Sequence, residues 1–272
     1  MIIETPFLRR VRGFIFGVIK VERKKRMEKI DEKILPQDWG NDSLSEFMIN
    51  AHRNIVASFV NLKPQYIRLG AINDSYKRIT ENLLNVRPLI PAFFLFRSHA
   101  SYLGAVRLVL SGQLPETYMV LRGCLENSLY ALHIYKIPGL SEIWSRRHDD
   151  EDSLKKCKEN FRIVNIFKTL ETEDDGLCKT ARMLYETTID YGGHPNEASL
   201  SSIIRKSEDE SKIDFRIPYL IDYRLNPEAF GLGLKSSARI GVCVLLIFKL
   251  IFRERFDILG ISDNLKNLKK GL

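Results

Sequence analysis

The sequence predicts an all-α protein, a helical bundle arranged around a central antiparallel helical hairpin at about 92–136. Apolar residues recur at helical spacing over long stretches, and proline, glycine, asparagine and aspartate separate these stretches. No alternation of strand and helix patterns runs along the chain, which disfavours an α/β sheet. The helical stretches at 92–110 and 115–136 are joined by only a few residues, and so short a connection predicts antiparallel neighbours.

Residues 1–35 are expected to form a basic amphipathic arm or helix. They carry ten Lys or Arg against five Asp or Glu, which accounts for much of the net charge of +8. Such a segment favours nucleic acid or anionic lipid as a partner, and a solubilising tail is the alternative. An apolar run at 13–19 lacks a signal-peptide cleavage pattern and is too short to span a membrane. The basic patch comprises Arg9, Arg10, Arg12, Arg23, Lys24, Lys25 and Arg26.

The segment 36–42 (PQDWGND) breaks the chain before the next helix, which we expect over about 43–60. Ser43 or Ser45 is the expected N-cap. A proline then interrupts the pattern, and another helix is predicted at about 65–85.

The central hairpin begins with a strong helical stretch at 92–110. Ser111, Gly112 and Gln113 form a good C-terminal stop. Pro115 then opens a helix that extends to Lys136, at a position where proline is tolerated.

Beyond the hairpin, a short helix is predicted at about 141–147 and a longer one at about 153–170. A polar loop at 171–176 precedes a helix at 177–190, which ends in the glycine-proline loop 191–196.

The C-terminal part begins with a weakly alternating stretch at 213–220, which predicts a short strand or an extended connection. The last long helix is expected from Pro227 to about Arg255, broken by glycines near 231–233. The domain organisation expected is an arm at 1–35, one helical domain at 39–260 and a basic tail at 261–272.

Four cysteines occur, without any CxxC pair, so a zinc framework and a secreted disulfide scaffold are both disfavoured. A cytoplasmic location is expected from this cysteine usage. We expect no metal and no cofactor, because no phosphate-binding, dinucleotide-binding or metalloprotease motif is present.

Arg122, Glu126 and His133 lie on the second helix of the hairpin within a wedge of roughly 40°. The helix is apolar around most of its circumference, so these groups are expected to be away from bulk water. Removing one partner of a buried Arg122–Glu126 pair would then cost about 3–5 kcal/mol. Two interpretations are open. The cluster is a structural salt bridge, or it is a site with Glu126 as base, Arg122 as anion clamp and His133 as acid or base.

Two further regions of the chain contain candidate site residues. Arg97 and His99 lie near the start of the first hairpin helix, where antiparallel packing is expected to bring His99 nearer to His133 than to Arg122. A partly exposed helix terminus is the favoured interpretation of both. His194 lies in the loop GGHPN at 192–196, where glycines allow close approach to a ligand. The alternative is a plain helix-ending turn.

The stretch SHASYLGAVRLVLSGQLPETYMVLRGCLENSLYALHIY, followed by YGGHPN, resembles uncharacterised bacterial helical proteins distantly similar to the HEPN-like superfamily. That superfamily includes ribonucleases of toxin and phage-defence systems. The resemblance covers roughly 92–200 and implies a site at Arg122, Glu126 and His194. No histidine of this chain completes the Arg-x4-6-His motif of the nuclease members.

The function expected is that of a HEPN-like, nucleic-acid-related or defence-associated protein with RNA or another nucleic acid as the partner. One alternative is a non-catalytic interaction module that forms homo-oligomers through apolar helix faces. Another is a peripheral membrane protein that uses its basic N-terminal segment, residues 7–29. Whether the protein is an enzyme is left open.

Overall fold

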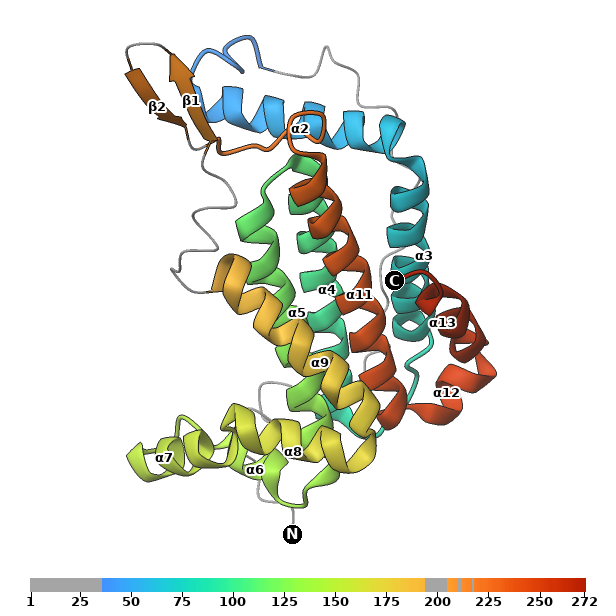
Figure 1. The fold of residues 1–272 in the computed structure, drawn as a ribbon. Coiled ribbons are helices and arrows are strands. Elements are labelled where there is room, and N and C mark those ends of the chain that lie inside the picture. Colours follow the sequence, from blue (N-terminus) through green and yellow to red (C-terminus); the bar gives the residue numbers. More distant parts are fainter. Residues whose placement is uncertain (1–35, 194–204, 210–211, 217) are drawn as a thin grey trace.

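The computed structural model describes residues 36–193, 205–209, 212–216 and 218–272, and most of these residues are helical (Figure 1). The all-α fold predicted from the sequence is confirmed. The basic patch in 1–35 and His194 both lie outside the described residues.

In chain order the elements are α2 (Ser43–Asn61), α3 (Lys63–Glu81), α4 (Leu89–Ser111), α5 (Leu114–Lys136), α6 (Leu140–Ser145), α7 (Glu151–Asn160), α8 (Ile163–Glu173), α9 (Asp175–Thr188), the π-helical turn η2 (Ile189–Gly193), the strands β1 (Arg205–Asp209) and β2 (Lys212–Arg216), α11 (Pro227–Ile251), α12 (Arg253–Ile258) and α13 (Ile261–Lys269).

Helices α4 and α5 form the predicted antiparallel hairpin and pack along their lengths. Gly112 caps α4 in the left-handed conformation, with φ of 89°, which glycine adopts without strain. A side chain at Gly112 would collide with the backbone of Ile221, whose N–H donates to the Gly112 carbonyl at 2.9 Å. The hairpin turn therefore also anchors the segment that leads into α11.

Helix α11 runs beside α4 and α5 through the middle of the molecule, and α9 crosses them (Figure 1). Gly241 lets three helices approach closely, because an added Cβ would lie 2.6 Å from Tyr102 of α4 and 2.9 Å from Ile72 of α3. The predicted break near 231–233 was wrong, since α11 is continuous from Pro227 to Ile251. Gly233 instead provides room for the side chains of Leu114 and Val109.

The single helix expected at 153–170 was also wrong. The chain forms α7 and α8 with a turn at Phe161, whose ring is buried against His133 and Tyr130. The polar loop expected at 171–176 is reduced to Asp174. This residue ends α8 and caps α9 by accepting the Leu177 N–H at 2.8 Å.

The C-terminal segment is more than the basic tail that we expected at 261–272. It contains α13, which packs on α3 and α11. Ile261 and Leu265 are buried in the core, and Asn264 donates to the hydroxyl of Ser75. Residue 260 is therefore not a structural boundary.

The two strands form one antiparallel hairpin, in which Arg205 pairs with Arg216 and Asp209 with Lys212. β2 coincides with the start of the weakly alternating stretch at 213–220. Across the part of the chain that is described, no helix combines the length and the apolar character needed to cross a bilayer.

Candidate functional site

Arg122 and Glu126 pair on α5, as their i, i+4 spacing predicts. The Nε of Arg122 donates to Oε1 of Glu126 at 2.9 Å. The pair lies on the side of α5 that faces α9, so a residue of a second helix completes the arrangement.

Tyr185 of α9 closes a three-membered hydrogen-bonded ring with this pair. Its hydroxyl accepts from Nη2 of Arg122 at 2.9 Å and donates to Oε1 of Glu126 at 3.3 Å. The Cζ of Arg122 also lies 5.1 Å from the centre of the Tyr185 ring, within cation–π range. We call Arg122, Glu126 and Tyr185 the arginine site.

Phe167 holds the Tyr185 ring in place from α8. The two rings meet edge to face with centroids 5.6 Å apart, and both side chains are buried. The hydroxyl of Tyr185 is thus fixed by packing on one side and by the ion pair on the other.

The environment keeps the site in one ionisation state. Burial acts to lower the pKa of Arg122, but the hydrogen bond and charge of Glu126, together with Tyr185, raise it overall. Burial raises the pKa of Tyr185, and the nearby Glu126 carboxylate raises it further. At neutral pH Arg122 is charged and Tyr185 is protonated, so both side chains are hydrogen-bond donors, and the carboxylate of Glu126 balances the charge of Arg122.

The expectation that the pair is away from bulk water was wrong. The Arg122 side chain retains 25% of its accessible surface and that of Glu126 retains 35%. The pair lies at the edge of the bundle, where α9 covers α5 only in part. It is therefore accessible to a ligand and partly screened by solvent.

His133 does not join the arginine site, although it lies on the same side of α5. Seven residues of helix place it about 10 Å along the axis from Glu126. Its Nδ1 lies 2.7 Å from the hydroxyl of Thr169, and its Nε2 lies 3.2 Å from the carbonyl of Asn160. Burial lowers its pKa. His133 thus ties α5 to α7 and α8 as a neutral side chain.

Arg97 and His99 also lie away from the arginine site. Arg97 is exposed on α4. His99 faces α3, where Nε2 lies 2.9 Å from Oδ1 of Asn73 and the ring stacks on Tyr76 at 5.1 Å. The expected approach of His99 to His133 was wrong, because the histidine packs against α3 instead of following α5.

The chain approaches α5 again just before His194. In η2, Gly192 lies so close to α5 that an added Cβ would collide with the carbonyl of Pro115 and with Tyr118. The rings of Tyr118 and Tyr191 lie 5.4 Å apart. Since Tyr118 is one helical turn before Arg122, the described chain reaches the neighbourhood of the arginine site. A role for His194 in it stays a prediction.

Tyr185 is the residue that the sequence analysis missed. Its signal is its spacing, since Leu177, Ala181 and Tyr185 share one face of α9 and all are buried. A tyrosine on a buried face needs a partner for its hydroxyl. The sequence alone does not say which helix supplies that partner.

No group of three or more metal-ligating side chains occurs in the described ranges. Comparison with protein-family models, with curated proteins and with solved structures found no match. The function is therefore inferred from the geometry of the site.

Proposed function

We propose that this protein is a HEPN-like helical protein that binds RNA through the arginine site. The observation that carries the proposal is the fixed, partly exposed guanidinium of Arg122, held by Glu126 and Tyr185. Guanidinium groups recognise phosphate well, because their planar N–H groups match the phosphate oxygens.

The charge of the whole chain supports the same partner. A net charge of +8 attracts nucleic acid over long range, and the basic segment 1–35 adds a concentrated source of that attraction. In this proposal the long-range charge brings RNA to the surface and Arg122 fixes its position.

The proposal is for binding, without cleavage of the usual HEPN kind. The chain lacks the Arg-x4-6-His motif, and His133 is held neutral against Thr169 and Asn160. A defence-associated role in the cytoplasm is part of the proposal, and the four buried free cysteines are compatible with a reducing compartment.

The test is the affinity for single-stranded RNA over a range of salt concentrations. The variants are Arg122→Gln and, as a control, Arg146→Gln, because Arg146 also pairs with a glutamate at i, i+4 but lies on the exposed α6 turn. We expect Arg122→Gln to weaken binding about tenfold and to reduce the salt slope by about 0.7. Arg146→Gln should stay within about twofold of the wild type. Wild-type protein that does not bind RNA, or equal slopes for both variants, would contradict the proposal.

A second candidate function has its own observation. Leu44, Met48, Val56 and Val60 recur at multiples of four residues along α2, in an apolar stripe that winds about 160° around the helix. Between 43% and 65% of each side chain is exposed. Such an apolar stripe favours an interaction module that assembles with a second copy of the chain. Sedimentation of the wild type and of Val56→Glu tests it. A dimer that dissociates in the variant supports assembly, and a wild type that is monomeric at high concentration excludes it.

A further inference from the structure

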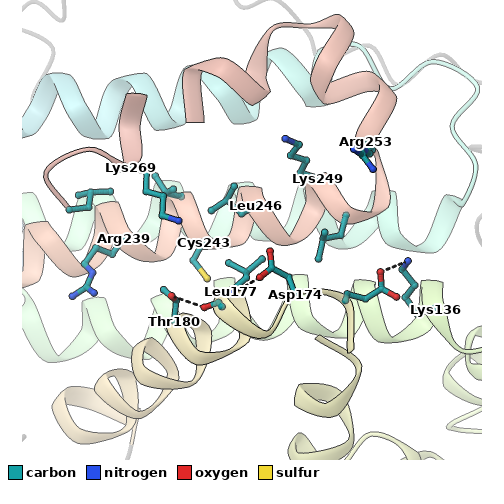
Figure 2. Close-up of a pocket in the computed structure, with 15 residues that line it drawn as sticks. Lys136, Asp174, Leu177, Thr180, Arg239, Cys243, Leu246, Lys249, Arg253 and Lys269 are labelled. Atoms are coloured by element: carbon teal, nitrogen blue, oxygen red, sulfur yellow. Dashed lines mark hydrogen bonds and ion pairs between the residues drawn. The ribbon is translucent and has the colours of Figure 1, made fainter. Parts of the chain in front are cut away.

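A large hollow lies between α9, α11 and α13, away from the arginine site. It has a volume of about 760 Å³, and the end of α5 and the α8–α9 junction close one side of it. Its floor is aliphatic and is formed by Leu177, Val242, Leu246 and Leu250, with the thiol of Cys243 among them (Figure 2). We call it the basic cavity.

Five cationic side chains line the basic cavity, and two carboxylates do not neutralise them. Glu173 already pairs with Lys136 at 2.6 Å. Asp174 is occupied in capping α9. Within the described part of the chain, no carboxylate lies within 4.0 Å of the other cations, which are Arg239, Lys249, Arg253 and Lys269.

The cations are distributed along the aliphatic floor. Arg239 and Lys269 lie at one end of the view, Lys249 and Arg253 lie at the other, and Leu246 and Cys243 lie between them (Figure 2). The five cations outnumber the two carboxylates of the lining, and the excess like charges repel one another. A ligand with an anionic group and an apolar part would lower the repulsion between the cations and would also remove the apolar floor from water.

We propose that the basic cavity binds an anionic amphiphile, with an alkyl chain on the aliphatic floor and a phosphate or carboxylate head group on the cations. The cavity has the volume of typical small-molecule sites, about 300–1,000 Å³. None of the described residues that line it is aromatic, so it offers no ring on which a nucleobase would stack. This favours an aliphatic ligand over a nucleotide. The inference goes beyond the proposed RNA binding and does not depend on it.

The test is calorimetric titration of the full chain with dodecyl phosphate below its micellar concentration. Inorganic phosphate supplies the head group alone, and dodecanol supplies the chain alone. We expect saturable one-to-one binding of dodecyl phosphate, with each of the other two at least about tenfold weaker. If inorganic phosphate binds as tightly, the cavity is a simple anion site. If dodecanol binds as tightly as dodecyl phosphate, the cavity is a simple apolar site. Either result, or no saturable binding, overturns the proposal.

Two double variants with the same change in charge locate the binding. Arg239→Gln with Lys269→Gln removes one cation of the cavity from α11 and one from α13. Lys235→Gln with Lys270→Gln removes two exposed cations, one from α11 and one just after α13, that do not line the cavity. We expect the first to weaken dodecyl phosphate binding by about tenfold or more, and the second to leave it within about twofold. Equal losses in both would show attraction by general charge and would overturn the proposal. Arg122→Gln should bind dodecyl phosphate like the wild type, which separates this result from the RNA test.

Discussion

The side chain of Arg122 is both held in place by its neighbours and partly exposed to solvent. Packing by Tyr185 and Phe167 fixes the guanidinium, yet a quarter of the Arg122 side chain stays accessible. A fully buried pair would be held by the cost of a stranded charge, whereas water compensates here when one partner is lost. The pair is therefore expected to contribute little to the stability of the fold.

We therefore predict that Glu126→Ala lowers the free energy of unfolding by about 0.5–1 kcal/mol, because Arg122 becomes hydrated. Urea unfolding followed by circular dichroism measures it. The control is Glu142→Ala, which breaks the more exposed pair with Arg146 and should have a smaller effect. A loss of about 3–5 kcal/mol for Glu126→Ala would show that the pair is effectively buried.

His99 predicts a specific pH dependence of stability. Burial lowers its pKa from 6.5 to about 4 in the folded protein. Between these values the unfolded chain binds a proton that the folded protein does not, so stability falls as the pH decreases from about 6.5 to about 4. The loss attributable to His99 should be about 3 kcal/mol.

The measurement is the free energy of unfolding against pH for the wild type and for His99→Gln. We expect the decrease toward acid pH to be shallower in the variant, while His133 still contributes its own part because burial also lowers its pKa. Identical slopes for the two proteins would mean that His99 titrates normally in the folded state.

Sequence reasoning was right about contacts within one helix and incomplete about contacts between helices. The Arg122–Glu126 pair follows directly from i, i+4 spacing. Tyr185 lies 59 positions from Glu126 in the chain, and only the packing of α9 on α5 brings the two together. His133 was grouped with Arg122 and Glu126 because a helical wheel gives the angle around the helix axis but ignores the distance along it.

At the scale of elements, the helices were largely predictable, and their interruptions were not. Gly112 closes α4 as expected, because a left-handed cap is a local requirement. The glycines near 231–233 were misinterpreted as a break in α11. Gly233, like Gly241, serves close packing, and that role depends on the side chains of other helices.

Gly241 and Gly231 allow a test, within α11 itself, of which glycine is needed for close packing against neighbouring helices. We predict that Gly241→Ala lowers the free energy of unfolding by about 1–3 kcal/mol, because the methyl group would press on Tyr102 and Ile72. Gly231 is exposed with nothing within 4 Å of an added Cβ, so Gly231→Ala should be neutral or stabilise by up to about 1 kcal/mol. Thermal unfolding of both variants checks this, and equal destabilisation would mean that α11 does not pack as closely as described.

At the scale of the whole molecule, the helical pattern and the lack of a strand–helix rhythm were enough to predict the class of fold. They did not predict the basic cavity, because its walls come from α9, α11 and α13, whose meeting is a property of the tertiary structure. The cysteines show how completely the core is closed, since all four are buried.

We predict that the thiols react slowly in the native protein. Burial raises the pKa of Cys124 and of Cys243 to about 12, so almost no thiolate is present at neutral pH. Labelling with a chromogenic disulfide reagent at pH 8 should be slow in buffer and rapid for all four cysteines in denaturant. Rapid native labelling of Cys124 would show that the central hairpin opens readily.

If the arginine site binds a ligand instead of supporting the fold, removing its positive charge and removing its negative charge should change RNA affinity in opposite directions. RNA affinity is measured for Arg122→Gln and Glu126→Gln, with Arg146→Gln and Glu142→Gln as the matched pair. We predict a loss of about tenfold for Arg122→Gln and a gain of a few-fold for Glu126→Gln, because the carboxylate of Glu126 both repels phosphate and competes with it for Arg122. Both control variants should change by less than about twofold. Affinities that fall in both site variants, or that change no more than in the controls, would contradict the account and leave the site as a structural ion pair.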